Sequence, residues 1–231
     1  MSDFDQSVAQ LATLYGSLLA PDQIVELRAL NVQRGSGRPH VEAGFYDMAH
    51  LSNLAADALR ITPSAKGVYF TLNPLNPDLL ARRANRIAWA NEGESAKDKD
   101  VLVRRWLLID ADPIRDPLVS ATDAEKAEAM QVVLEVRSHL DARGWPTPIL
   151  ADSGNGYHLL YRVDAPADDG GDTKRLLGAL SQRFDTPRVK IDRSVFNPGR
   201  ICKLPGTLAR KGDHTPTRPH RRATVLEGPK P

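Results

Sequence analysis

The chain has 231 residues, of which 41% are hydrophobic and 26% charged, and its formal net charge is +2. This composition is typical of a globular protein with one large domain or two small ones, and a single cysteine, Cys202, excludes an internal disulfide and a cysteine-rich zinc site. No apolar run approaches the roughly 18 residues of a membrane span, and the first ten residues are polar and acidic. We therefore expect a cytoplasmic protein without a membrane partner.

The first hundred residues alternate between helical and strand-like patterns. Pro21 ends the first helix, Asp47 is a candidate N-cap for the second, and Pro77 suits the first turn of a third. The elements predicted here are a helix at 5–19, a strand at 24–32, a loop at 34–40, a helix at 47–60, a strand at 66–72, a helix at 76–90 and a polar connection at 91–100.

The remaining residues continue the alternation, with one tight hairpin. Thr122 or Asp123 can cap a long helix that Gly144 ends. The elements predicted here are a strand within 104–113, a helix at 122–144, strands at 147–153 and 157–163, a helix at 171–184, a strand at 189–194 and a last strand at 223–227. Because a hairpin makes a sheet at least partly antiparallel, the predicted class is α+β.

Two carboxylates end an apolar run in the segment RRWLLIDADP. The run Trp106–Ile109 predicts a buried strand, which Pro113 stops. Side chains on a strand alternate, so Asp110 and Asp112 should project from the same face. Two anions so close need a cation between them, a shared proton or solvation. Taken alone, the segment is better explained as a solvated turn, and the rest of the chain has to decide.

A second motif, SGNGYH, predicts a β-hairpin because Asn-Gly favours the turn that matches strand twist. With Asn155 and Gly156 as the loop residues, Ser153 would lie opposite His158, and both side chains would share a face. The glycine-rich turn, which includes Gly154, could cradle an anion such as a phosphate with bare N–H groups. A plain hairpin with a surface histidine is the alternative.

A third motif, VKIDRSVFNPGRICKLPGT, begins as a strand on which Lys190 and Asp192 share a face. Asp192 is a candidate third carboxylate, although a surface ion pair with a neighbouring base would explain it too. Arg200 and Lys203 are candidates for binding a triphosphate, since arginine offers a fork and lysine a point charge. Nonspecific contact with a nucleic-acid backbone is their alternative role.

Positive charge is concentrated near the C-terminus. Residues 188–222 carry a net charge of +8 and the rest of the chain −6. This asymmetry predicts a polyanionic partner, and apolar residues interleaved in the segment argue against a disordered tail. The residues predicted to contact the phosphates of a nucleic acid are Arg210, Lys211, Arg218, Arg221 and Arg222.

In this order, the three motifs LLIDADP, SGNGYH and KIDRSVFNPGRICKLPGT resemble those of the archaeo-eukaryotic primase superfamily, in particular the primase-polymerases of phages, plasmids and mobile elements. The resemblance implies an RNA-recognition-like mixed or antiparallel sheet packed against an N-terminal α/β unit. It also implies template-directed, two-metal nucleotidyl transfer from nucleoside triphosphates on single-stranded DNA.

Carried over residue by residue, the resemblance implies that Asp110, Asp112 and Asp192 hold two Mg²⁺ or Mn²⁺ ions. The residues assigned to the nucleotide are Ser153, Gly154, Asn155, Gly156, His158, Arg200 and Lys203. No Cys/His cluster for a zinc-binding insertion is found.

The expected organisation is an N-terminal helix followed by one catalytic domain in two parts. The ranges are 1–20 for the helix and 21–226 for the catalytic domain, divided into 21–100 and 101–226. Residues 227–231 are expected to begin a linker, so a helicase domain or subunit could follow.

Three other functions compete with this hypothesis. A metal-dependent nuclease also uses clustered carboxylates. A rolling-circle initiator would attack with Tyr157 or Tyr161, but it normally needs a His-x-His pair, and no two of the six histidines are two residues apart. A non-catalytic RNA-recognition-type module would explain the basic segment but not three anions beside a polyanion. Trp89, Trp106 and Trp145 are expected in a core or interface rather than as base-stacking platforms.

Overall fold

The computed structural model describes residues 2–228 and has two compact units. The first unit contains the residues up to 103 together with 199–208, and the second contains 104–198 and the residues from 209 onward. The sequence suggested a division between 100 and 101. Residues 199–208 join the first unit because the strand within them pairs with that unit's sheet. No helix within residues 2–228 combines the length and the apolar character needed to cross a bilayer.

The first unit contains a five-stranded sheet in the order β4-β2-β1-β3-β9, in which all neighbouring strands are antiparallel. Central strand β1 is buried on both faces: Leu27 and its neighbour Glu26 are both fully inaccessible. The elements are α1 (Asp3–Leu18), β1 (Val25–Val32), β2 (His40–Tyr46), η1 (Met48–His50), α2 (Leu51–Ile61), β3 (Gly67–Thr71), η2 (Pro77–Arg82), β4 (Ala88–Ala90), η3 (Asp98–Asp100) and β9 (Ile201–Lys203).

The prediction of a helix at 76–90 is wrong. The segment forms the short 3-10 helix η2 and then the edge strand β4, which pairs with β2. Between them, Asn85 has a positive φ of 55°, and its N–H donates to the carbonyl of Phe45 at 2.7 Å. Because the unsatisfied edge of β2 offers hydrogen bonds to this segment, sheet pairing overrides its local helical pattern.

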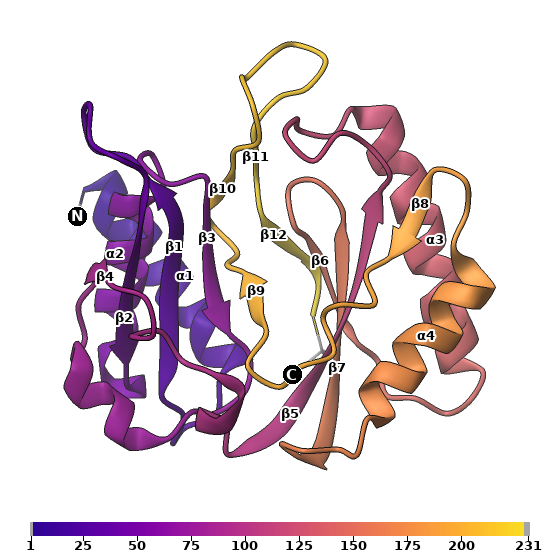
Figure 1. Cartoon of the computed structure of the whole chain (residues 1–231), viewed down its shortest axis with the longest axis horizontal. Helices are drawn as coiled ribbons and strands as arrows, with labels where there is room; N and C mark the ends of the chain where they lie inside the picture. The colour runs from indigo at the N-terminus through magenta and orange to yellow at the C-terminus, as the bar shows by residue number, and fades with distance from the viewer. Residues whose placement is uncertain (1, 229–231) are drawn as a thin grey trace. The chain divides into compact units, whose positions relative to one another are not determined.

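The second unit contains another five-stranded sheet, in the order β12-β6-β7-β5-β8, with α3 and α4 on one of its faces (Figure 1). Its elements are β5 (Val103–Pro113), α3 (Asp123–Asp141), β6 (Ile149–Asp152), β7 (Tyr157–Pro166), α4 (Asp172–Phe184), β8 (Val189–Ile191) and β12 (Thr224–Glu227). The strands β10 (Leu208–Ala209) and β11 (Arg221–Arg222) form a separate two-stranded ribbon. The succession β5-α3-β6-β7-α4-β8, with β5 and β7 central, is the split βαβ topology of RNA-recognition folds.

The long helix predicted at 122–144 is confirmed as α3. Thr122 accepts the N–H of Glu125, and the Glu125 carboxylate accepts the N–H of Thr122, which completes the capping box. Gly144, with φ of 77°, supplies the left-handed conformation just after the helix. The strand predicted at 189–194 is shorter than expected, because β8 ends at Ile191 and leaves Asp192 immediately beyond it.

Candidate functional site

The three predicted carboxylates share one face of the second sheet. In the antiparallel pairing of β5 with β8, Asp112 lies opposite Lys190. The N–H of Asp192 extends this ladder and donates to the carbonyl oxygen of Asp110 at 2.8 Å. Since side chains alternate along a strand, Asp110, Asp112 and Asp192 all belong to the same face.

His158 lies on that same face. Its Nε2 is 3.5 Å from Oδ1 of Asp110, and its side chain is almost completely buried. The neighbouring residue Tyr157 points the other way, because its ring contacts the ammonium of Lys126 on helix α3. The carboxylates and the imidazole therefore gather on the face of the sheet that faces away from α3.

The hairpin register differs from the prediction by two positions. The N–H of Ser153 donates to the carbonyl of Gly156 at 3.0 Å, so the loop residues are Gly154 and Asn155 rather than Asn155 and Gly156. His158 consequently lies opposite Ala151, and the predicted Ser153–His158 pair is wrong. A shift of two keeps every side chain on its face, so Ser153 and His158 still share one face as diagonal neighbours.

Gly156, the residue directly before β7, lies close against β5. A β-carbon there would lie 2.3 Å from Oδ1 of Asp112 and 2.4 Å from the carbonyl oxygen of Ala111. Only a residue without a side chain can occupy such a position. Gly156 therefore places the hairpin directly against the Asp112 carboxylate.

The N–H groups of Gly154 and Gly156 are not bare, contrary to expectation. The N–H of Gly154 donates to Oδ1 of Asp152 at 2.6 Å, and that of Gly156 donates to Oγ of Ser153 at 3.0 Å. The buried side chain of Asn155 accepts the N–H of Ala121 at 2.8 Å. A phosphate bound by these groups would have to replace hydrogen bonds that hold the turn, and their role in nucleotide binding stays a prediction.

Sequence reasoning missed a buried ion pair that braces this turn. The ammonium of Lys126 is 2.6 Å from Oδ1 of Asp152, the same oxygen that accepts the N–H of Gly154. Burial lowers the pKa of Lys126, and the attraction of Asp152 opposes that shift. The signal was present in the sequence, since Lys126 stands at helical spacing with the buried residues Ala129 and Val133. A lysine on the core face of a helix indicates a buried partner.

Replacing Lys126 by methionine is expected to lower the free energy of unfolding by about 2–3 kcal/mol. The substitution keeps the apolar stem but leaves the partly buried carboxylate of Asp152 without its cation. Chemical denaturation of the parent, Lys126→Met, Asp152→Asn and the double variant measures the coupling. Additive losses in the double variant would show that the two side chains do not stabilise each other.

The oxygen atoms of the three predicted carboxylates can be compared with the ligands that divalent ions prefer. Asp110 and Asp112 supply the oxygen ligands that Mg²⁺ and Mn²⁺ prefer. Asp192 directs one carboxylate oxygen to the N–H of Ser194 at 2.8 Å. Within residues 2–228, no three His, Cys, Asp or Glu side chains are gathered closely enough to hold an ion. The pair on β5 fits a cation, and Asp192 would complete the set after turning away from Ser194.

Arg200 and Lys203 belong to the first unit, where Lys203 ends strand β9. The buried ammonium of Lys203 donates to the carbonyl of Leu208 at 2.7 Å and lies 5.3 Å from the ring centre of Tyr69. Burial lowers the pKa of Lys203 to about 7. The assignment of Arg200 and Lys203 to a nucleotide stays a prediction.

The lowered pKa of Lys203 has a consequence for stability. Between about pH 7 and 10.5 the unfolded chain holds a proton on this amine that the folded chain has released. The free energy of unfolding should therefore rise with pH across this window, by up to about 1.4 kcal/mol per pH unit. Denaturation series of the parent and Lys203→Met measure the effect. An equally steep rise in Lys203→Met would assign it to other groups.

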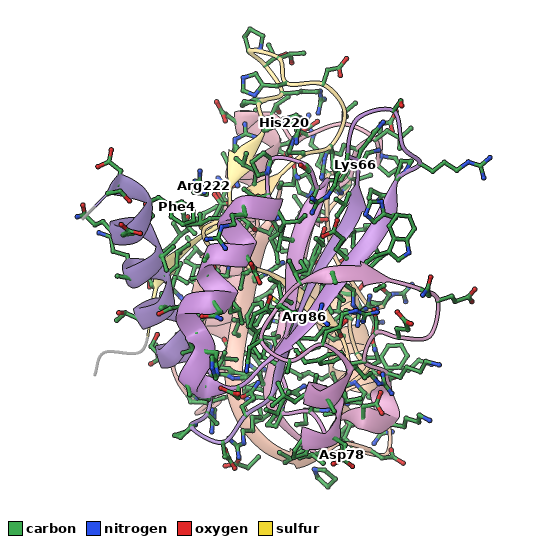
Figure 2. All side chains as sticks on the ribbon, turned by 90° about the vertical axis from the view of Figure 1, so that its left-hand side faces the viewer. Phe4, Lys66, Asp78, Arg86, His220 and Arg222 are labelled. Carbon is green, nitrogen blue, oxygen red and sulfur yellow. The ribbon has the colours of Figure 1, made fainter. Side chains whose placement is uncertain are left out.

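Two of the five predicted phosphate contacts are engaged within the second unit. Arg218 forms a bidentate ion pair with Glu125 at 3.0 Å for each bond, and Arg221 pairs with Asp123 at 2.5 Å. Both arginines thus bind the first turn of α3, where the carboxylates also favour the helix dipole. Arg210 and Lys211 are half-buried, and Arg222 is exposed on β11 (Figure 2). Nucleic-acid binding by all five stays a prediction.

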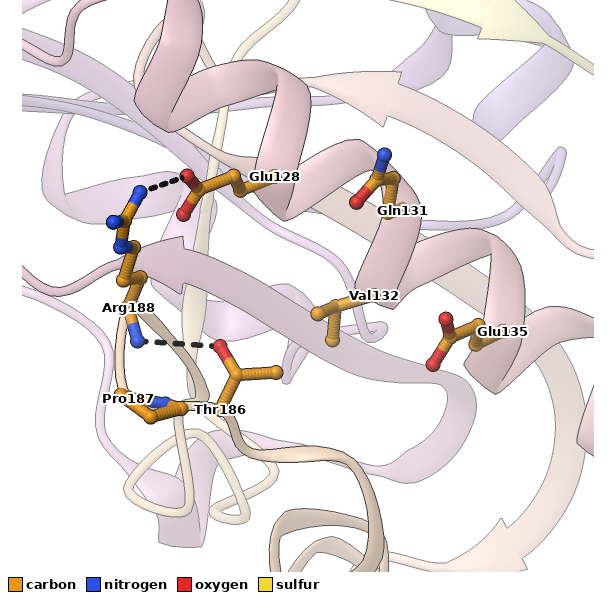
Figure 3. A pocket seen from close by; sticks show the side chains of 7 residues that line it. All are labelled: Glu128, Gln131, Val132, Glu135, Thr186, Pro187 and Arg188. Atoms are coloured by element: carbon orange, nitrogen blue, oxygen red, sulfur yellow. Dashed lines mark hydrogen bonds and ion pairs between the residues drawn. The ribbon is translucent and has the colours of Figure 1, made fainter.

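The second unit also contains a hollow (Figure 3). It is formed by α3 and the connection from α4 to β8, and the Glu128–Arg188 ion pair of 2.7 Å borders it. Its other lining residues are Gln131, Val132, Glu135, Thr186 and Pro187. Since α3 covers the opposite face of the sheet from His158, this hollow is not part of the candidate site.

The chain resembles a known protein in structure but not in sequence. No family model matches the chain, and no curated protein matches its sequence significantly. Among solved structures, the polymerase domain of Ligase D from Mycobacterium tuberculosis, in complex with DNA, is similar with a TM-score of 0.46 and 17% identity. The match covers 95% of this chain and 78% of that one.

Proposed function

We propose that the chain is a primase-polymerase that joins nucleotides on a single-stranded DNA template during replication of a phage, plasmid or other mobile element. The observation that supports this function best is the gathering of Asp110, Asp112, Asp192 and His158 on one face of an RNA-recognition-like sheet. Proteins with such sheets bind nucleic acid on the sheet surface. Carboxylates on such a surface would repel the phosphates unless cations lie between them.

The proposed roles follow from this placement. Asp110 and Asp112, joined by Asp192, would hold two divalent ions. When bound, such ions activate an attacking 3′-hydroxyl and stabilise the leaving pyrophosphate. Gly156 allows the hairpin to stand against Asp112, which keeps the hairpin and the carboxylates in a fixed relation. His158 and Ser153 would bind the triphosphate of the incoming nucleotide from the same face.

One observation favours a second candidate function, a non-catalytic nucleic-acid-binding module. Within the described part of the chain, residues 2–228, no three His, Cys, Asp or Glu side chains lie close enough together to hold a metal ion. Such a module would bind single-stranded DNA in the same way with and without Mg²⁺ and nucleotides. A nuclease would use the same carboxylates but would shorten DNA rather than extend it. An assay with a labelled primer distinguishes the three, because it reports extension, shortening or no change.

His158→Ala is expected to raise the KM for nucleotide about 10- to 100-fold, because one charge-assisted hydrogen bond to the triphosphate is lost. Template affinity should stay within about twofold of the parent, since no template contact is assigned to this side chain. Nucleotide titrations with saturating template, and DNA titrations without nucleotide, measure both quantities. The control is His139→Ala, which removes a histidine of α3 in the same unit. An unchanged KM with weakened DNA binding would reverse the assignment of His158.

A further inference from the structure

Trp89 occupies an unusual position for a tryptophan. It lies on β4, the strand at one end of the first sheet, and 56% of its surface is exposed. The other two tryptophans meet the sequence expectation, since Trp106 is buried and Trp145 packs edge-on against Tyr161. A single exposed aromatic residue is common in proteins. The contacts of Trp89 must therefore decide whether its exposure has a function.

The indole of Trp89 is stacked on the imidazole of His40. The two ring centres are 3.8 Å apart, and the ring planes are inclined by only 13°. Nε2 of His40 is 3.1 Å from a carboxylate oxygen of Glu42, and its Nδ1 is 3.3 Å from the carbonyl of Arg38. Glu42 is buried, lies opposite Trp89 in the strand pairing and forms two 3.0 Å bonds with Arg34. Contacts among Trp89, His40, Glu42 and Arg34 thus fix the orientation of the stacked indole and imidazole rings.

The two sequence segments that contain these stacked rings are both rich in arginine. Residues 33–40, which lead into His40, contain Arg34 and Arg38 and no acidic residue. Residues 81–90, which include β4, contain Arg82, Arg83 and Arg86 and no acidic residue. Figure 2 turns the β4 side of this unit toward the viewer and labels Arg86. Glu42 and Glu94 pair with Arg34 and Arg83, which leaves a net charge of +3 from these two segments and their partners.

We propose that Trp89 and His40 form a stacking site for a base of single-stranded DNA, with arginines of the two flanking segments near its phosphates. A fixed aromatic face beside cations is the combination that binds single strands, because every base can stack and every linkage is anionic. This site lies in the first unit, whereas residues 210–222 belong to the second, and it does not depend on catalysis.

The test uses the full chain and a fluorescently labelled oligo(dT), with EDTA present and nucleotides absent. Trp89→Ala should weaken binding about 5- to 100-fold, because stacking of one base is lost. Trp89→Phe should retain most of the affinity, since a smaller ring still stacks. Leu102→Ala is the matched control, because Leu102 is also apolar, equally exposed and part of the same unit. Equal affinities for the parent, Trp89→Ala and Leu102→Ala would overturn the proposal.

Fluorescence gives a second, independent measurement. Unlabelled oligo(dT) should quench the emission of the parent and should leave Trp89→Phe, which retains the other two tryptophans, nearly unchanged. The Asp110→Ala/Asp112→Ala variant should show the same quenching as the parent, so a failure of the catalytic proposal would not affect this result. Quenching that rises with protein concentration in the absence of DNA would overturn the proposal in favour of contact between two copies of the chain.

Discussion

Replacing Asp110 and Asp112 together by alanine is expected to abolish nucleotide incorporation without unfolding the protein. The two carboxylates are the proposed ligand pair on β5, and ions held there would supply several kcal/mol of transition-state stabilisation. Their loss should therefore reduce the rate on the order of 10³-fold or more. The melting temperature of the metal-free variant should equal or exceed that of the parent, because two neighbouring anions no longer repel each other.

The control for this variant is Asp164→Ala. Asp164 is an exposed carboxylate on the same strand and in the same alternation as His158, but it lies six residues further along β7. The Asp164→Ala variant should retain full activity. Incorporation of a labelled nucleotide and thermal melting are measured for all three proteins. If the double variant stays active, the carboxylates are not the catalytic ligands, and if its melting temperature falls steeply, their role is structural.

The Gly156→Ala variant should lose both activity and stability. Its added methyl group would meet the Asp112 carboxylate at 2.3 Å and the Ala111 carbonyl at 2.4 Å. The Ala111 carbonyl belongs to the backbone of β5, so it cannot yield without disturbing the sheet. Overpacking of this kind costs about 1–3 kcal/mol. Because displacement of β7 also moves Asp112 relative to His158, we expect kcat to fall further than the loss of folded protein explains.

A second glycine provides the matched control. In Gly178→Ala, on α4, the methyl group meets nothing within 4 Å, so the variant should be as active as the parent. It should gain up to about 1 kcal/mol in stability, because alanine favours a helix interior over glycine. Denaturation curves and rates per folded molecule are compared for both variants. Parent-like behaviour of Gly156→Ala would show that β5 and β7 are not as tightly packed as the structure indicates.

Local patterns were sufficient to predict the elements that carry the candidate site. The apolar run before Asp110, the capping box at Thr122 and the glycine-rich turn each have a signature within a few residues of sequence. The alternation of side chains then predicts correctly that Asp110 and Asp112 share a face. These features are determined by neighbouring residues, so the sequence alone reveals them.

The hairpin register could not be predicted, because distant residues determine it. A β-carbon on Gly154 would lie 2.6 Å from the side chain of Ala209 and 3.1 Å from the carbonyl of Arg221. Gly154 also has a positive φ of 94°, as a loop glycine requires. Close approach of β5 instead determines the position of Gly156. The Asn-Gly preference is local, and these tertiary contacts override it.

The same reason explains the error at β4. The segment 76–90 has a helical pattern, but the edge of β2, more than thirty residues earlier, draws its last part into a sheet. The error at the turn amides is different, because Asp152 and Ser153, which accept the N–H groups of Gly154 and Gly156, are neighbours in the sequence. Only the ion pair that holds Asp152 depends on another element, through Lys126 on α3.

Template-directed incorporation tests the central claim most directly. The full chain is given Mg²⁺ or Mn²⁺, a primed homopolymer of single-stranded DNA, and one labelled nucleotide at a time. The proposed function predicts incorporation of the complementary nucleotide, little incorporation of the other three, and none with the Asp110→Ala/Asp112→Ala variant. Binding of the same DNA without extension under any of these conditions would contradict the claim and favour a non-catalytic module.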